Sequence, residues 1–205
     1  MSASERRQAE KEMIREKILA ASSRILAKEG YDKLSIRKIA TQIEYSPGVI
    51  YHYFKDKAEI ITFITRQGYS KLLEQIEETP IDQEQPDKTL ETSLRAYIKL
   101  MLSKPNHFKA NVIKDVENVD KQPGILQDGS FDQRQGLSIV IQILELGMST
   151  GKFRTLDPKL TAQIIWTSTY GLVTRLILEN QLPKAQQERL IDHHFEVLIH
   201  GLLRK

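Results

Sequence analysis

Apolar residues recur every three to four positions along most of the chain, and this pattern predicts helices almost throughout. A first helix is expected from about Arg7 to Lys28, with one apolar and one charged face, and Gly30 is a suitable C-cap. Glu5, Glu10 and Glu12 dilute the basic residues near the N-terminus, and a frayed terminus before about Arg7 is expected rather than a basic arm. The sequence contains no strand-like alternation, internal repeat or low-complexity tract.

Two short helices separated by a tight turn are expected next. In the segment Ser35–Ile43, Ser35 is a good N-cap, and the isoleucines with Ala40 form one buried face. Ser46 is the next N-cap candidate, and Pro47 suits the first helical position, where an N–H would lack a partner anyway. Two such helices form a helix-turn-helix, whose second helix enters the DNA major groove.

The second of these helices carries a specific motif. In chain order its residues are Ser46, Gly48, Ile50, Tyr51, Tyr53, Phe54 and Lys57. This run resembles the recognition segment of TetR-type transcriptional regulators, and the upstream pair Ile39-Ala40 is similar to that family's pattern. The resemblance implies an N-terminal three-helix DNA-binding domain followed by a helical domain with an effector pocket.

One residue departs from the family pattern. Glu44 stands in the turn where the family usually has Gly. A residue with a Cβ is strained at positive φ, so either the turn has a different geometry or it carries strain.

The remaining chain also reads as helical. Asp56 and Glu59 suit the N-cap and N3 positions of a long connecting helix that ends near Glu78, before a proline-containing loop at Thr79–Asp87. Later helices are expected at Leu90–Met101, Asn106–Asn118, Phe131–Thr150, Asp157–Gln181 and Ala185–Leu203, with an irregular region at Asp120–Ser130. The fold class is therefore all-α with about nine helices. Residues 1–56 are expected to form the helix-turn-helix DNA-binding domain and residues 57–205 the effector-binding and dimerisation domain.

Charge is distributed unevenly between these two parts. Residues 1–57 contain 12 Lys+Arg against 8 Asp+Glu, a net charge of +4, and the rest contains 18 against 19, a net charge of −1. The positive excess lies with the segment expected to contact phosphates. The chain has no Cys and no apolar run long enough for a membrane span, and its charged N-terminus is unlike a signal peptide. We expect a cytoplasmic protein with no membrane partner.

The types of residue in the motif suggest their roles at DNA. Tyr51 and His52 carry polar-tipped rings that can reach phosphates or base edges, and Gly48 lets the backbone approach DNA closely. Helix N-termini supply further phosphate donors. The residues expected to bind DNA are Ser35, Arg37, Lys38, Ser46, Pro47, Gly48, Tyr51, His52 and Lys57.

The second domain contains one cluster of residues that could have a catalytic role. His193, Glu196 and His200 share one helix face at a spacing that metal ligands could use, but a solvated or subunit-facing polar strip is the favoured interpretation. Glycine-rich phosphate loops, Glu-x-x-His pairs and Ser/His/Asp signatures are missing from the sequence. We therefore expect no enzyme activity, no metal site and no cofactor.

Two surfaces of the second domain are predicted to be functional. The helix Asp157–Gln181 is apolar nearly all round, which predicts a homodimer in which this helix and the last one meet their symmetry mates. An apolar effector cavity is expected to be lined by Leu94, Tyr97, Met101, Phe108, Ile143, Trp166 and Tyr170. Thr169 and the two tyrosines could supply its polar groups.

Together these features predict a DNA-binding transcriptional regulator. The preferred hypothesis is a repressor that binds double-stranded DNA at a palindromic operator and is released by a small hydrophobic or aromatic effector. The alternative is a helical binding or scaffold protein with a degenerate helix-turn-helix, for which Glu44 is the best support. A metal-dependent enzyme is a third possibility.

Overall fold

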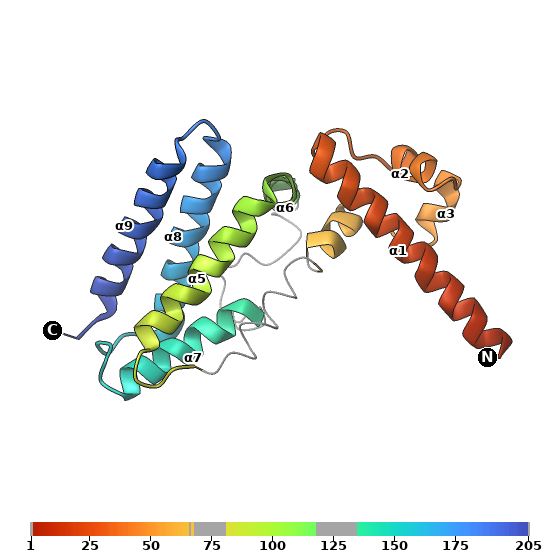
Figure 1. Cartoon of the computed structure of the whole chain (residues 1–205). Helices are drawn as coiled ribbons and strands as arrows, with labels where there is room; N and C mark the ends of the chain where they lie inside the picture. The colour runs from red at the N-terminus through yellow and green to blue at the C-terminus, as the bar shows by residue number, and fades with distance from the viewer. Residues whose placement is uncertain (1, 66, 68–80, 118–134, 205) are drawn as a thin grey trace. The chain divides into compact units, whose positions relative to one another are not determined.

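The computed structural model describes residues 2–65, 67, 81–117 and 135–204, and the prediction of an all-α fold is confirmed (Figure 1). The helices are α1 (Ala3–Glu29), α2 (Ile36–Gln42), α3 (Pro47–Tyr51), a segment described over 57–65, α5 (Pro86–Ser103), α6 (Pro105–Glu117), α7 (Gln135–Ser149), α8 (Pro158–Leu178) and α9 (Lys184–Leu202). The described ranges thus contain nine helices, together with one isolated antiparallel bridge that pairs Phe153, after α7, with Leu203, after α9. The predicted end of the connecting helix near Glu78 and the irregular region at Asp120–Ser130 lie outside the described residues.

The start of α1 corrects one prediction. Helix α1 begins at Ala3, so the segment expected to fray is helical. The Ser2 hydroxyl accepts from the Glu5 backbone N–H (3.2 Å), and the Glu5 carboxylate accepts from the Ser2 N–H (2.7 Å). This capping box satisfies backbone donors that would otherwise favour unravelling. The mixed charges of this segment do not decide whether it is helical. The Ser-x-x-Glu spacing does, because it forms the capping box.

Several other helix ends agree with the sequence. Gly30 has φ 83°, a conformation that favours glycine, and its N–H donates to the Leu26 carbonyl. Asp157 caps α8 by accepting from the N–H groups of Lys159 (2.9 Å) and Leu160 (3.0 Å).

Packing divides the chain into two compact units. The first comprises residues 1–70 and 104–118, and the second comprises residues 71–103 and 119–205. Helix α6 therefore belongs to the first unit, although it lies far along the chain from α1. The predicted boundary between a DNA-binding domain (residues 1–56) and an effector-binding domain (residues 57–205) remains a prediction. The two packing units are divided at other positions in the chain.

The first unit is built around one apolar core. Its fully buried members include Ile18 and Leu26 of α1, Ile39 of α2 and Ile50 of α3. Helix α6 adds Ala110, which is also fully buried. Side chains of α6 hold it to α1, because the Asn106 amide donates to the Ala27 carbonyl (2.9 Å) and His107 Nε2 lies 2.9 Å from Ser23 Oγ. Burial lowers the pKa of His107, and the nearby Lys104 charge adds to this effect.

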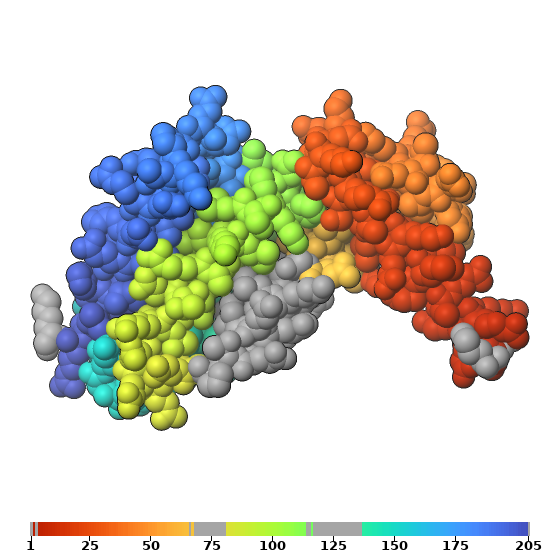
Figure 2. Space-filling view, viewed as in Figure 1, coloured from red at the N-terminus to blue at the C-terminus, as the bar shows by residue number. Residues whose placement is uncertain are grey.

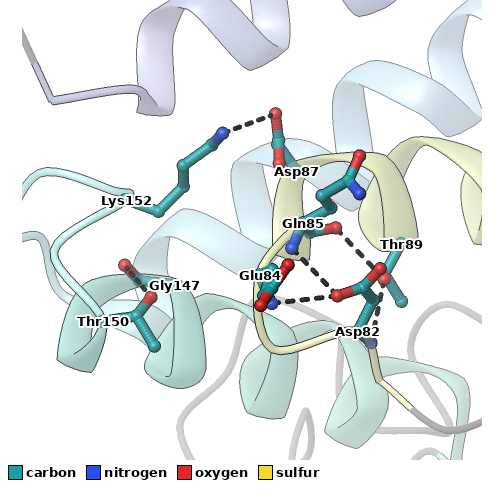
Figure 3. Close-up of polar contacts among 8 residues, drawn as sticks. All are labelled: Asp82, Glu84, Gln85, Asp87, Thr89, Gly147, Thr150 and Lys152. Atoms are coloured by element: carbon teal, nitrogen blue, oxygen red, sulfur yellow. Dashed lines mark hydrogen bonds and ion pairs between the residues drawn. The ribbon is translucent and has the colours of Figure 1, made fainter.

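In the second unit, α5 packs against α7, α8 and α9. The segment before α5 is ordered by Asp82, whose Oδ1 accepts from the N–H groups of Glu84 (2.9 Å) and Gln85 (3.1 Å) (Figure 3). Lys152, beyond α7, lies 3.5 Å from the Asp87 carboxylate at the start of α5. These contacts hold the segment before α5 in place and tie the start of α5 to the segment that follows α7.

The buried ring of Phe153 packs directly on the backbone of α7. A Cβ placed on Gly147 would lie 2.1 Å from a Phe153 ring carbon, a distance that atoms do not tolerate. Glycine at this position therefore allows the close approach that seats Phe153 in the core.

Helix α8 buries only one of its apolar faces. Ile165, Val173 and Leu176 are buried within the unit, whereas Leu160, Ile164 and Leu178 are exposed. Leu190 and Val197 of α9 are exposed as well. Within the described ranges, no helix combines the length and the apolar character needed to cross a membrane.

Candidate nucleic-acid interface

Helix α2 is capped as the sequence predicts. Ser35 is extended (φ −143°, ψ 153°), and its hydroxyl accepts from the Lys38 backbone N–H at 3.2 Å. Buried Ile39 and Ala40 anchor the helix in the core, which leaves Ser35 and Arg37 exposed. The Lys38 ammonium forms an ion pair with the Glu29 carboxylate at the end of α1. Lys38 therefore pairs with Glu29 within the unit, although it lies next to the exposed residues Ser35 and Arg37.

The turn after α2 keeps the geometry that glycine usually supplies. Glu44 has φ 62°, the single positive φ of a non-glycine residue within the described ranges. The Tyr45 N–H donates to the Ala40 carbonyl (3.0 Å), and the Glu44 N–H donates to the Thr41 carbonyl (3.3 Å). This is the Schellman pattern, with Glu44 at the position where glycine is favoured. Of the two alternatives that the sequence left open, the structure has the strained residue in an unchanged turn.

Helix α3 presents a short polar surface. Ser46 is the extended N-cap and Pro47 the first helical residue, although the Ser46 side chain forms no capping hydrogen bond. Ile50 is fully buried and fixes the rotation of the helix. Gly48, Tyr51 and His52 are therefore exposed, and Tyr51 has 59% of its surface accessible.

The helix that follows begins with a network of caps. Asp56 Oδ1 accepts from the Glu59 N–H (2.8 Å), and the Glu59 carboxylate accepts from the Lys55 N–H (2.6 Å), one residue before a standard capping box. The Lys57 ammonium donates to the Tyr31 carbonyl (2.8 Å) and lies 3.5 Å from the centroid of the Tyr31 ring. Lys57 thus holds the loop after α1 in place, a role that the sequence did not suggest.

The structure gathers most of the predicted DNA-contact residues on one short segment. Those exposed are Ser35, Arg37, Ser46, Pro47, Gly48, Tyr51 and His52. Lys38 and Lys57 are partly buried and have partners within the unit. The nine residues thus divide into an exposed set and a pair of lysines that also support the fold.

The second unit contains the aromatic residues expected to meet an effector. The Tyr97 and Trp166 ring centroids lie 4.9 Å apart, and those of Trp166 and Tyr170 lie 6.3 Å apart with nearly parallel planes. Leu94 and Ile143 are buried in the same unit, and Met101 is partly buried. Phe108 is also buried, but it belongs to α6 in the first unit.

A polar pair lies beside these rings. The hydroxyl of fully buried Thr169, on α8 between Trp166 and Tyr170, is 3.1 Å from Nε2 of His194 on α9. Burial lowers the pKa of His194, which favours the neutral form of its ring. Sequence reasoning missed His194, and its signal was weak because a single histidine in a helix is not distinctive.

The residues considered for a metal site lie at the surface. His193 Nδ1 is 3.0 Å from Glu196 Oε2, and both side chains are mostly exposed. In the described part of the chain, no three His, Cys, Asp or Glu side chains are grouped to hold an ion. Their exposure in the protomer is compatible with the solvated or subunit-facing polar strip that the sequence favoured.

Comparison with known proteins identifies the first unit's motif. Residues 18–62 match the sequence profile of bacterial regulatory proteins of the tetR family. The fatty acid metabolism regulator protein of Bacillus subtilis is 24% identical over 189 residues, covering 92% of this chain and 95% of that protein. The transcriptional repressor AcnR of Corynebacterium glutamicum is 24% identical over 165 residues, 77% of this chain and 86% of its own length.

A solved structure resembles nearly the whole chain. The crystal structure of FadR from Bacillus subtilis in complex with stearoyl-CoA superposes with a TM-score of 0.68 at 22% identity. The superposition covers 90% of this chain and 97% of that one. At this level of identity the comparison shows a common fold.

The turn at Glu44 gives a first testable prediction. Replacing Glu44 by Gly should raise the free energy of unfolding by about 0.5–1 kcal/mol, since the left-handed strain removed outweighs the added freedom of the unfolded chain. Glu44→Ala is the matched control, because it removes the carboxylate but keeps the Cβ. Chemical denaturation of the three proteins measures the effect, and equal stability of the Gly and Ala variants would contradict a strained turn.

Proposed function

Because the chain belongs to the TetR family of bacterial regulatory proteins, we propose that it is a transcriptional repressor that binds a palindromic operator as a homodimer and leaves it when a hydrophobic effector binds. The main support for DNA binding is the way the first unit exposes the polar residues of α3. Its buried Ile50 and the intact turn at Glu44 hold Gly48, Tyr51 and His52 outward on one short helix.

The chemistry of this surface fits a DNA duplex. The polar tips of Tyr51 and His52 can donate to phosphates or reach base edges, and exposed Arg37 adds a cation near the start of α2. The net charge of +4 over residues 1–57 favours attraction to the phosphate backbone. A scaffold protein with a degenerate motif remains the alternative, but a preserved turn removes the argument that Glu44 offered for it.

Substitution on α3 tests DNA binding. Tyr51→Ala should weaken operator binding roughly ten-fold, which corresponds to about 1.4 kcal/mol for a lost contact. Fluorescence anisotropy with duplexes that the protein selects from a randomised pool measures the effect, and the parent's affinity should fall steeply as salt rises.

Tyr51→Phe is the matched variant, because it keeps the ring and removes only the hydroxyl. Its affinity for the operator should lie between those of the parent and Tyr51→Ala, because the ring contacts remain and only the hydroxyl contact is lost. A Tyr51→Ala protein that is helical by circular dichroism and binds like the parent would show that α3 does not read the DNA. Lys57→Ala is a poorer test, since it also breaks the contact with Tyr31.

The proposed dimer is supported by the outer face of α8. Leu160, Ile164 and Leu178 are exposed in the protomer at helical spacing, and the same is true of Leu190 and Val197 on α9. An exposed apolar stripe of this kind is typical of a subunit interface. A two-fold dimer would also supply two recognition helices, one for each operator half-site.

A charge placed on this face should prevent assembly. Ile164→Glu should convert the dimer to monomers at micromolar concentration, because a carboxylate buried against apolar side chains carries a large desolvation cost. Val116→Glu is the matched control, since Val116 on α6 is exposed to the same extent as Ile164, 69%. Sedimentation velocity reports the assembly state. A parent protein that is monomeric, or an Ile164→Glu protein that stays dimeric, would contradict this interface.

The effector is proposed to be hydrophobic, with a long acyl group as the first candidate. The second unit offers a row of rings formed by Tyr97, Trp166 and Tyr170, with the neutral Thr169–His194 pair beside it. Apolar walls with a few polar groups suit an apolar ligand. The similarity to a fatty acid metabolism regulator and to a protein crystallised with stearoyl-CoA supports an acyl thioester as the probe.

The single tryptophan makes this proposal measurable. Acyl-CoA thioesters of increasing chain length should release the operator and change the Trp166 emission over the same concentration range, since Trp166 contacts Tyr97 and Tyr170. Trp166→Ala should weaken the response to the thioester while sparing DNA affinity. Free CoA is the control and should have neither effect. An inducer that leaves the emission unchanged and acts equally on Trp166→Ala would place the pocket elsewhere.

A further inference from the structure

The first turns of α1 extend beyond the core of the first unit. Residues 4–13 are all exposed, and the first fully buried residue of α1 is Ile18. In the space-filling view these turns stand clear of α2 and α3 (Figure 2). Isolated helices of this length are marginal in water, so the Ser2–Glu5 capping box and continuity with the packed part of α1 hold this extension together.

Charges on the extension are sorted by face. Arg7, Lys11 and Arg15 are four residues apart, so each step rises about 6 Å and turns about 40°, which places the three cations in one row. Ser4 and Gln8 lie on the same side. The acidic residues lie at least about 100° around the helix from Lys11. They are Glu5, Glu10, Glu12 and Glu16.

The structure fixes the direction in which this row points. The Arg15 guanidinium lies 4.4 Å from the centroid of the Phe63 ring and 5.6 Å from that of Phe54. Phe54 directly follows the helix-turn-helix, and Phe63 belongs to the helix described over 57–65. The row therefore continues along the side of α1 that packs against the helix-turn-helix core. Within the described residues, the basic groups of Arg7 and Lys11 form no ion pair.

We propose that Arg7 and Lys11 contact phosphates of the DNA that flanks the recognition site, so that the extension lengthens the bound segment of duplex. This inference rests on the proposed DNA-binding function. Arg15 pairs with Glu12 (3.5 Å), which leaves Arg7 and Lys11 as the cations that continue from the helix-turn-helix side of α1. Their charge is complementary to duplex DNA, which presents a continuous line of phosphates. Contacts to phosphates add affinity without sequence preference.

The test compares two double variants with the same change in net charge. R7Q/K11Q removes the row, and R6Q/K17Q removes two cations about 120–140° away from Lys11 around the helix. Gln has a helix propensity close to those of Arg and Lys, so both proteins should keep the helical content of the parent by circular dichroism. Binding is measured by anisotropy against salt, on a selected operator with long flanks and on the same operator trimmed to its sequence-specific core.

On the long duplex, R7Q/K11Q should bind at least ten-fold more weakly than the parent, with a slope of log K against log salt that is shallower by about 3–4 for four lost contacts per dimer. R6Q/K17Q should behave like the parent, and all three proteins should bind the trimmed duplex alike. Equal losses in the two double variants, or an unchanged slope for R7Q/K11Q, would overturn the inference while leaving DNA binding intact. A parent that binds no duplex would instead refute the proposed function.

Discussion

The shared apolar core of the first unit is the interaction on which the candidate interface depends. Helix α3 has only five residues, too few to be stable by its own hydrogen bonds. Its position is set by Ile50, and the position of the next helix by Phe54, both almost completely buried. Each such side chain contributes about 1.5–3 kcal/mol of burial. Tyr51 and His52 are therefore exposed because Ile50 and Phe54 are anchored in the core.

The course of the chain gives this core a connection to the second unit. The backbone passes between the units near residues 70, 103 and 118, and the returning segment is α6. Ala110, Asn106 and His107 bind α6 to α1 and to the core. A ligand can shift an equilibrium only through its differential affinity for two states. The chain connections at both ends of α6, and the one that follows the helix described over 57–65, are the covalent routes between the two units.

Features encoded by local chemistry could be predicted from the sequence, and those that depend on distant packing could not. Ser35, Pro47 and Gly30 act at helix ends as predicted, and α8 begins next to Asp157, where its helix was expected to start, because caps depend on residues a few positions apart. The place of α6 in the first unit could not be predicted, since its periodicity is the same whichever neighbour covers it. The contact of Lys57 with Tyr31 likewise joins residues that only the fold brings together.

The uncovered face of α8 has a consequence for how stability is measured. Leu160, Ile164 and Leu178 are exposed in the folded protomer. In the proposed dimer a second molecule would cover them, and it would bind the native state and not the unfolded chain. By mass action, the midpoint of thermal unfolding should then rise with protein concentration. Melting temperatures of this protein and its variants have a common meaning only when they are recorded at one concentration.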